Sequence, residues 1–438
     1  MQFYLWTIGC QMNFADSRRV AEELARAGFQ EVSRPQDAGL ILLNTCVVRQ
    51  SAEDKVVGRL TSLQGLKRRK PETLLALMGC FVDEIPALQD RYPWVDAFIK
   101  PSDIGAVMDL AQQQMAEGSL APAPRAPIST GVSISYGCDH TCTYCIVRLR
   151  RGEEVSRPLE EVVAEVQDLA TRGVREVTLL GQNVDSYGHD LPPLSPRPLP
   201  GESGNGRPPD LADLLEAVHN VEGLARIRFL TSHPADMTDR LIETAARLPK
   251  VCEHIEVPVQ SGDDAVLRRM GRGYSVAQYR DLVRRIRGHM PGVGLATDVI
   301  VGFPGETEAQ FEATYRLLED LRFDMVHVAA YSPRPGTPAE RLADDVPPAE
   351  KERRRQAVDA LQEGIVSEIN ARLLGQQVEV LVEGRYKGKW RGRTRTNKLV
   401  FFDTGEEDWT GALVQVRITR AGAWSMQGDV SQASGPAD

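Results

Sequence analysis

The chain has 438 residues, of which 42% are hydrophobic and 26% charged, and its formal net charge is −9. This composition is typical of a globular protein and excludes disordered, collagenous and fibrous classes, and the length predicts about two to four domains. The negative charge argues against a nucleic-acid partner, because phosphate binding needs clustered Lys and Arg, unless the average hides a local basic patch.

The amino-terminal part of the chain alternates short apolar runs with amphipathic stretches, which predicts a βαβαβ unit with an open parallel sheet. The runs cover residues 3–8, 40–43 and 74–78, and the stretches cover 16–28 and 52–69. We expect Asp16 to cap the first helix and Gly28 to end it. Cys10, Cys46 and Cys80 each follow an apolar run, and the carboxyl ends of parallel strands share one edge of a sheet, so these cysteines can converge in space.

A second unit follows residues 117–130, which contain three prolines and predict a linker. Six β/α units are two short of a closed eight-stranded barrel, so we expect a partial barrel that is open on one side. Residues 188–210 hold seven prolines and four glycines and predict a surface loop. The candidate strands are 132–135, 176–180, 226–230, 254–259, 295–301 and 325–331, with a helix at 159–171 among the patterns between them.

The sequence pattern of the carboxyl-terminal part changes from helical to strand-like after a helical stretch at 349–374. Alternating segments that break at Gly predict a small all-β barrel. Residues 384–398 hold seven Lys or Arg and no acid, interleaved with Tyr386 and Trp390, a pattern typical of nucleic-acid binding. A solvated β-surface remains the alternative. The domains we expect are 1–116, the linker 117–130, 131–370 and 371–438.

The seven cysteines do not suggest a disulfide framework, because their number is odd and no secretory signal precedes them. No apolar run reaches the ~18 residues that cross a bilayer, so we expect a cytoplasmic protein without membrane contact. Cys138, Cys142 and Cys145 form C-x3-C-x2-C. Three thiolates on a four-iron cluster leave one iron open to chelate a substrate or cofactor. Zinc would need a fourth ligand, and His140 is too close in sequence to supply it easily.

A resemblance to a known family begins at this motif, in which Tyr144 precedes the last cysteine, as in the radical S-adenosylmethionine enzymes. The match extends through TIGCQMNFADS, NTCVVRQSAEDK, GCFVDE, GQNVDSYG, TSHP, PVQSG, TDVIVGFPGET, YSPRPGTPAE and GRTRTNK. This ordered series resembles the methylthiotransferases, specifically their MiaB-type tRNA-modifying branch.

The resemblance implies two 4Fe-4S clusters, one on Cys10, Cys46 and Cys80 and one on the C-x3-C-x2-C cysteines, together with S-adenosyl-L-methionine. In the family, reductive cleavage of S-adenosylmethionine yields a radical that removes hydrogen from carbon 2 of a modified adenine. Sulfur is inserted at that carbon, and a second S-adenosylmethionine supplies the methyl group. The N-terminal cluster is the family's proposed site of sulfur supply. The resemblance also implies tRNA, a low-potential electron donor and a sulfur source as partners, and we expect a monomer.

The S-adenosylmethionine pocket should lie at the carboxyl ends of the barrel strands. Besides Tyr144, our candidates are Gly181, Gln182, Asn183, Gln260 and Asp298, each of which has an alternative interpretation as a turn residue or strand-end cap. The family also has a C-terminal TRAM domain that binds tRNA. The family motif GRTRTNK lies within the basic segment 384–398. The tRNA-binding residues we expect are Lys387, Lys389, Arg391, Arg393, Arg395 and Lys398.

Two residues depart from the family pattern. Arg148 stands where the family usually has proline, which removes a rigid turn near the cluster. Asp185 stands where the family often has Asn. Cys252 has no partner motif and is interpreted as a buried structural thiol, and His233 as a hydrogen-bonding residue at a strand end.

The leading hypothesis is methylthiolation of carbon 2 of N6-isopentenyladenosine adjacent to the tRNA anticodon. The first alternative is methylthiolation of a ribosomal-protein aspartate, and the second is the same reaction on threonylcarbamoyl-adenosine in tRNA. CQMN and NTCVVR resemble the isopentenyladenosine branch better. A non-enzymatic RNA-binding iron-sulfur sensor is the alternative of another class, and it predicts no cleavage of S-adenosylmethionine.

Overall fold

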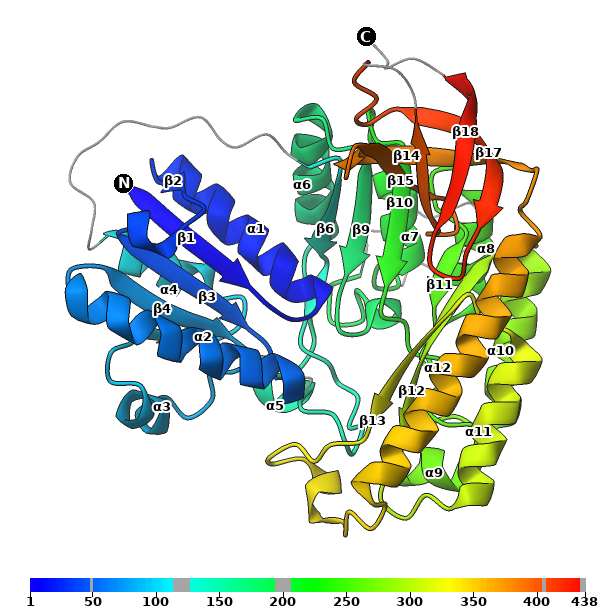
Figure 1. Cartoon of the computed structure of the whole chain (residues 1–438), viewed down its shortest axis with the longest axis horizontal. Helices are drawn as coiled ribbons and strands as arrows, with labels where there is room; N and C mark the ends of the chain where they lie inside the picture. Colours follow the sequence, from blue (N-terminus) through cyan, green and yellow to red (C-terminus); the bar gives the residue numbers. More distant parts are fainter. Residues whose placement is uncertain (48–49, 113–126, 194–205, 404–406, 434–438) are drawn as a thin grey trace.

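The computed structural model describes residues 1–47, 50–112, 127–193, 206–403 and 407–433, arranged as three successive units (Figure 1). The predicted linker 117–130 lies mostly outside the described residues, as do residues 194–205 of the predicted loop. Among the described residues, no helix is both long and apolar enough to cross a membrane.

The N-terminal unit is a parallel sheet in the order β2-β1-β3-β4-β5, covered by helices on both faces. Strand β3 is buried throughout, as expected for a strand covered on both faces. The elements are β1 (Gln2–Thr7), α1 (Gln11–Arg26), β2 (Gln30–Glu31), β3 (Leu40–Thr45), α2 (Gln50–Arg69), β4 (Leu74–Gly79), α3 (Ile85–Arg91), β5 (Ala97–Ile99) and α4 (Ile104–Gln112).

The predicted start of the first helix was wrong. Helix α1 begins at Gln11 with Cys10 at its N-cap, and Asp16 lies inside the helix rather than at its end. The Asp16 side chain is buried and accepts hydrogen bonds from Ser102 and Arg151. An acidic residue inside a helix is therefore explained by a tertiary partner that helical periodicity does not reveal.

The central unit is a curved row of six parallel strands, as predicted. Strands β6, β9 and β10 pair as one group and β11, β12 and β13 as another, and bridges at Ile227–Val251 and Gln260–Val299 join neighbouring segments. Among the described residues, no strand closes the gap between β6 and β13, so the barrel is partial. The six strands are β6 (Ser129–Ser133), β9 (Glu176–Leu180), β10 (Arg226–Leu230), β11 (His254–Glu256), β12 (Gly294–Val301) and β13 (Met325–Ala330). The short strands β7 (Ser135–Tyr136) and β8 (Val155–Ser156) form a separate antiparallel pair.

The helices of this unit pack outside the strands, and their apolar faces form the largest core of the protein. The predicted helix at 159–171 is α6, with the same bounds. Strand β11 is three residues shorter than predicted, because Pro258 has no N–H to donate to a ladder. The helices are α5 (Val147–Arg151), α6 (Leu159–Thr171), α7 (Leu211–His219), α8 (Asp239–Arg247), α9 (Asp264–Arg269), α10 (Val276–His289), α11 (Glu308–Leu321) and α12 (Pro348–Ala371).

The C-terminal unit is a closed five-stranded barrel in the order β14-β15-β16-β18-β17. Its interior is filled by Val, Phe, Trp and Ile side chains from alternate strand positions. The strands are β14 (Gln377–Tyr386), β15 (Lys389–Thr394), β16 (Leu399–Asp403), β17 (Leu413–Ala421) and β18 (Met426–Ala433).

Buried arginines of β10 hold this small barrel against the amino ends of the central strands. Arg226 donates to the carbonyl oxygen of Arg393 at 2.7 Å, and Arg228 donates to those of Thr394 and Arg395 at 2.8 Å each. In return, Arg395 donates to both carboxylate oxygens of Glu253 at 2.7 and 2.8 Å. The interface therefore fixes the C-terminal barrel at the end of the central unit opposite the carboxyl ends of its strands.

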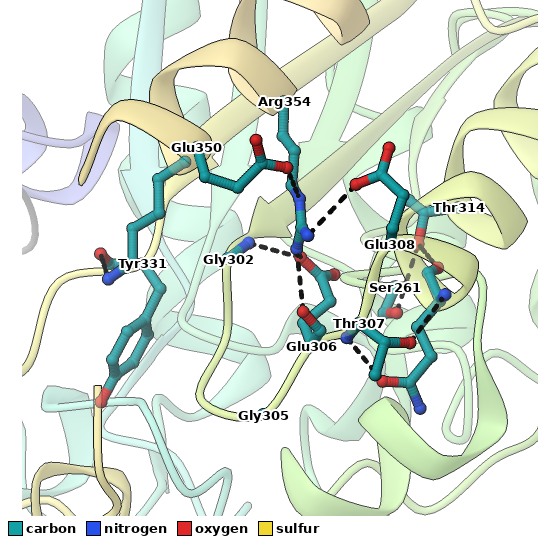
Figure 2. A network of polar contacts seen from close by, with 12 residues as sticks. Ser261, Gly302, Gly305, Glu306, Thr307, Glu308, Thr314, Tyr331, Glu350 and Arg354 are labelled. Atoms are coloured by element: carbon teal, nitrogen blue, oxygen red, sulfur yellow. Dashed lines mark hydrogen bonds and ion pairs between the residues drawn. The ribbon is translucent and has the colours of Figure 1, made fainter. Parts of the chain in front are cut away.

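Helix α12 holds two segments that follow central strands (Figure 2). Arg354 donates to the carboxylate of Glu306 at 2.8 Å, and that carboxylate also accepts the N–H of Gly302 at 2.6 Å. One turn earlier, Lys351 donates to the carbonyl oxygen of Tyr331 at 3.1 Å. Only 5% of the Arg354 side chain and 1% of the Glu306 side chain are exposed, so this ion pair is shielded from water.

Changing Arg354 to Met should destabilise the protein by about 3–5 kcal/mol, because it leaves the buried Glu306 carboxylate without its charged partner. Chemical denaturation monitored by circular dichroism measures this loss. The matched control is Arg353→Met on the same helix, where half of the side chain is exposed and the ion pairs face solvent, so the unfolding midpoint should hardly move. Equal midpoints for the two variants would contradict a structural role for the buried pair.

Candidate active site

The three N-terminal cysteines are brought together at the carboxyl edge of their sheet. Cys10 follows β1, and Cys46 and Cys80 directly follow β3 and β4. Gly9 lies so close to Cys46 that a Cβ atom on Gly9 would stand 2.5 Å from the Cys46 Cβ and 3.1 Å from its Sγ. Burial is the main reason that the pKa of Cys80 is raised, and a charge on Cys10 adds to the effect. The predicted convergence is therefore present in the fold.

The second cysteine set lies in the loop between β7 and α5. Burial raises the pKa of Cys138 to about 12 and that of Cys145 to about 11, and the charge of Cys142 adds to both effects. The free thiols of Cys138 and Cys145 are consequently neutral near pH 7. A bound metal centre would supply the positive charge that stabilises their thiolate forms.

A cavity of about 640 Å³ opens next to this loop, at the carboxyl ends of the central strands. Five of the six residues predicted to bind S-adenosylmethionine line it, together with all three cysteines of the motif. The lining includes Cys138, Cys142, Tyr144, Cys145, Gln182, Asn183, Gln260 and Asp298. Gly181 is not among the lining residues in the described part of the chain. A Cβ atom there would stand 2.6 Å from the Oγ of Ser135, so glycine at this position permits close packing of β9.

Two residues at the rim of the cavity have unfavourable backbone conformations. Thr231 follows β10 with φ +77°, and Gln260 has φ +69°. Side chains other than glycine rarely adopt this left-handed region, and a β-branched residue such as Thr does so least readily. The hydrogen bond from the N–H of Gln260 to the carbonyl oxygen of Asp298, at 2.8 Å, helps to hold one of them. Such strain is concentrated at functional sites, which supports this cavity as the binding site.

Two stacked histidines form one wall of the cavity, and sequence reasoning missed their role. The rings of His140 and His233 are 3.7 Å apart, and Asp236 Oδ2 lies 2.6 Å from His140 Nε2. Asn183 donates to the same oxygen at 2.6 Å. Burial lowers the pKa of His233 to about 3, with the positive charge of Arg272 as a further cause, so its ring is neutral. The contact with Asp236 thus fixes the orientation of the His140 ring at the wall of the cavity.

Arg272 is a further lining residue that the sequence did not single out. Its guanidinium is buried, and Nη1 donates to the Sγ of Cys142 at 3.4 Å. The remaining nitrogens donate to the hydroxyl of Tyr274 at 2.9 Å and to the carbonyl oxygen of Pro258 at 3.2 Å. A fixed positive charge therefore lies beside one cysteine of the motif, although 130 residues separate the two in the sequence.

The two departures from the family pattern fit the structure. Burial raises the pKa of Asp185 to about 8, and its carboxyl group accepts hydrogen bonds from Ser232 and from the backbone N–H of His233. A carboxyl group that is mostly protonated near pH 7 is neutral, as the side-chain amide of Asn is. Arg148 lies in the first turn of α5 and donates to the carbonyl oxygen of Asp139 at 2.7 Å, so a hydrogen bond to the cysteine loop stands where the family has a rigid proline.

The basic segment of the C-terminal barrel is divided between two roles. Lys387 and Arg391 are exposed on the β14–β15 hairpin, where they lie over the ring of Tyr386. Arg395 and Lys398 instead face the central unit, where Lys398 donates to Asp324 at 2.6 Å. Lys389 and Arg393 lie between these groups and pair with Asp403 and Glu383. The hairpin is therefore the part of the segment whose positive charges face solvent.

The residues around the cavity fit an iron-sulfur cluster and S-adenosylmethionine. Three thiols share one loop at its wall, and the unpartnered Nε2 of buried His233 and Oδ1 of buried Asn183 leave polar groups available inside. This donor set suits a cluster with one open iron, and the cavity size suits a nucleoside-sized ligand.

Comparisons with known families agree with this division of the chain. Residues 132–318 match the Radical SAM superfamily, residues 2–100 match the Uncharacterized protein family UPF0004, and residues 371–431 match the TRAM domain. The three matches coincide with the central, N-terminal and C-terminal units.

Solved structures share the fold at low sequence identity. The radical S-adenosylmethionine methyltransferase TsrM from Kitasatospora setae has a TM-score of 0.54 at 14% identity, covering 77% of this chain and 75% of that one. The cobalamin-dependent S-adenosylmethionine radical enzyme OxsB has a TM-score of 0.50 at 12% identity, covering 84% and 56%.

Curated relatives are far more similar. The tRNA-2-methylthio-N(6)-dimethylallyladenosine synthase of Roseiflexus sp. (strain RS-1) is 51% identical, covering 99% of this chain and 90% of the relative. The proteins of the same name from Dehalococcoides mccartyi (strain CBDB1) and Moorella thermoacetica are 48% and 43% identical, with 97% and 98% of both chains covered. The chain thus belongs to the MiaB-type tRNA methylthiotransferases, a family of radical S-adenosylmethionine enzymes that use a 4Fe-4S cluster.

Proposed function

We propose that this chain methylthiolates carbon 2 of N6-isopentenyladenosine adjacent to the tRNA anticodon. The observation that carries the proposal is the meeting of both cysteine sets at one place. Cys80 is close enough to Cys145 for its charge to affect the pKa of that thiol, and Ile146 packs in the core of the N-terminal unit. A carbon that is activated at one set can therefore be reached by sulfur held at the other.

Each cysteine set would hold one 4Fe-4S cluster, giving two per chain. When bound, the central cluster supplies the electron that cleaves S-adenosylmethionine, and the N-terminal cluster supplies sulfur. Cys138, Cys142 and Cys145 would hold the first, and Cys10, Cys46 and Cys80 the second. The family pattern agrees with the structure, in which Cys10, Cys46 and Cys80 follow strands of the N-terminal sheet and the other three cysteines share the loop after β7, and this agreement supports the assignment.

The protein's own residues bind and orient the cofactor. Tyr144, Gln182, Asn183, Gln260 and Asp298 offer polar atoms around the cavity, and the buried guanidinium of Arg272 adds a positive charge suited to a carboxylate. The apolar strand-end segment 328–330 lines another part of the cavity and limits the access of water. Tyr331 completes this wall, and Lys351 of α12 holds its carbonyl oxygen.

The partners follow from this chemistry. The reaction requires a low-potential electron donor and a sulfur source, and we propose a monomer that acts in the cytoplasm, where tRNA is modified.

The names and identities of the relatives do not favour the alternative substrates, a ribosomal-protein aspartate or threonylcarbamoyl-adenosine. The sensor alternative leaves the nucleoside-sized cavity beside the cysteine loop without a purpose.

The substrate is tested by mass spectrometry of tRNA nucleosides from cells with and without the gene. Deletion should remove the 2-methylthio group from isopentenyladenosine and leave the unmodified nucleoside in its place. Complementation with the intact gene should restore it, and a variant with Cys138, Cys142 and Cys145 changed to Ala should not. An unchanged 2-methylthio nucleoside in the deletion strain would contradict the proposed substrate.

The number of clusters is tested by iron content. Changing Cys138, Cys142 and Cys145 together to Ala should lower the iron bound per chain by about half, because each set should hold one cluster. Inductively coupled plasma mass spectrometry after anaerobic reconstitution measures it. The control is Cys252→Ala, which removes a buried thiol outside both sets and should leave iron unchanged. Iron content that is unaffected by the triple change would refute the two-cluster assignment.

The role of the basic hairpin is tested by the salt dependence of tRNA binding. Changing Lys387, Lys389 and Arg391 to Ala should weaken binding and lower the slope of log K against log salt by about one unit for each phosphate that the variant no longer neutralises. The control is Arg420→Ala, which removes an exposed charge of the same barrel outside the hairpin. If both variants change the slope equally, the hairpin is not the specific tRNA-binding element.

A further inference from the structure

The N-terminal cysteine site contains one buried residue from the central unit, Arg151. Helix α5 begins two residues after Cys145 and lies between the N-terminal sheet and the end of β13 (Figure 1). Its last residue, Arg151, is only 3% exposed in its side chain. The loop that carries the central cysteines therefore also delivers a guanidinium to the other cysteine set.

The guanidinium of Arg151 contacts a group beside each N-terminal cysteine. It donates to the thiol sulfur of Cys80 and, at 3.0 Å, to Asn13 Oδ1. Asn13 in turn lies next to both remaining cysteines. The Sγ of Cys10 is 3.6 Å from the Oδ1 of Asn13. The Nδ2 of Asn13 donates at 2.8 Å to the carbonyl oxygen of Thr45, the residue before Cys46. Arg151 is thus linked to Cys80 directly, to Cys10 through the amide of Asn13, and to the backbone just before Cys46 through the same amide.

A buried acid fixes the orientation of Arg151. Both Nη atoms lie 3.3 Å from Asp16 Oδ2, and Ser102 bonds both partners at 3.0 Å. Burial acts to lower the pKa of Arg151, but the charges of Cys80, Asp16 and Cys10 outweigh it, so the net shift is upward and the side chain remains charged. The Asp16 side chain, 1% exposed, accepts from both Nη atoms and so holds one edge of the guanidinium.

We propose that Arg151 is a positioning residue for the N-terminal cluster, which it orients through Cys80 and whose reduction potential it raises. This inference rests on the proposed function, because it requires a cluster at Cys10, Cys46 and Cys80. Reduction adds negative charge to a cluster held by thiolates, and a fixed positive charge that donates a hydrogen bond to a sulfur ligand stabilises that form. The central set has a parallel feature, since Arg272 donates to the Sγ of Cys142.

The proposal is tested on full-length protein with Cys138, Cys142 and Cys145 changed to Ala, in which the N-terminal cluster alone should remain. The readout is the midpoint potential from a redox titration monitored by electron paramagnetic resonance. Arg151→Met should lower the equilibrium constant for one-electron reduction at least tenfold, which equals a midpoint about 59 mV more negative. Arg151→Lys keeps the charge and should keep most of the parent potential.

Two controls separate the hydrogen bond to Cys80 from other effects. The Arg148→Met variant also removes one positive charge from α5. Because the Arg148 side chain contacts Asp139 and Glu153, this variant should leave the midpoint potential unchanged. Because Arg151→Met also leaves Asp16 unpaired, the Arg151→Met/Asp16→Asn double variant is compared with Asp16→Asn alone. The double variant should still have the more negative potential.

Each outcome decides between the possibilities. Equal midpoints for the parent and Arg151→Met, or equal shifts for Arg148→Met and Arg151→Met, overturn the proposal. If the Arg151→Met variant binds no iron, the Arg151→Lys variant is the deciding test. Iron bound at the parent potential in Arg151→Lys supports the role of the positive charge. Absence of iron, or a shifted potential, in Arg151→Lys overturns the proposal. If the background without the central cysteines holds no iron at all, the two-cluster assignment fails instead.

Discussion

The parallel direction of the strands in two separate sheets is the constraint on which this structure depends. In each sheet, all strands end at the same edge, so residues far apart in the sequence are collected there. The N-terminal sheet gathers Cys10, Cys46 and Cys80, and the central strands gather the lining of the cavity. Because Ile146, next to the central cysteine loop, packs in the N-terminal core, the two edges lie together. The two cysteine sets are therefore brought near one another, although they belong to different units.

Buried arginines fix the positions of the three units and their sites relative to one another. Arg151 crosses from the central unit to the N-terminal cysteines, Arg226 and Arg228 hold the C-terminal barrel, and Arg354 holds the segment after β12. A buried charge is tolerated only when it is paired and hydrogen-bonded, and each of these guanidiniums meets that condition with several acceptors. Their directional bonds give a defined geometry where apolar packing alone would permit sliding. The C-terminal barrel is consequently fixed at the opposite end from the cavity.

Most of the architecture was predictable because its signals are local. Strands 176–180 and 226–230 and the helix at 159–171 have the bounds that apolar patterning indicates. The errors arise where a distant contact overrides a local signal. Asp16 has the chemistry of a helix cap but lies inside α1, because a buried arginine is available to pair with it. The basic segment 384–398 has the pattern of a single nucleic-acid-binding surface, whereas Arg395 and Lys398 serve the interface with the central unit.

The sequence alone determined which chemistry is available. The spacing of Cys138, Cys142 and Cys145 is local, and three thiols in one loop favour a cluster with one open iron. Only the tertiary structure decided which side chains surround that centre. His233 and Arg272 lie 95 and 134 residues beyond Cys138 in the chain, and no periodicity connects them to it. The physical reason is that the three thiols are held by one short loop, so their spacing can be read from neighbouring residues. The burial of the site and the charged side chains around it depend on how helices and strands from distant parts of the chain pack together.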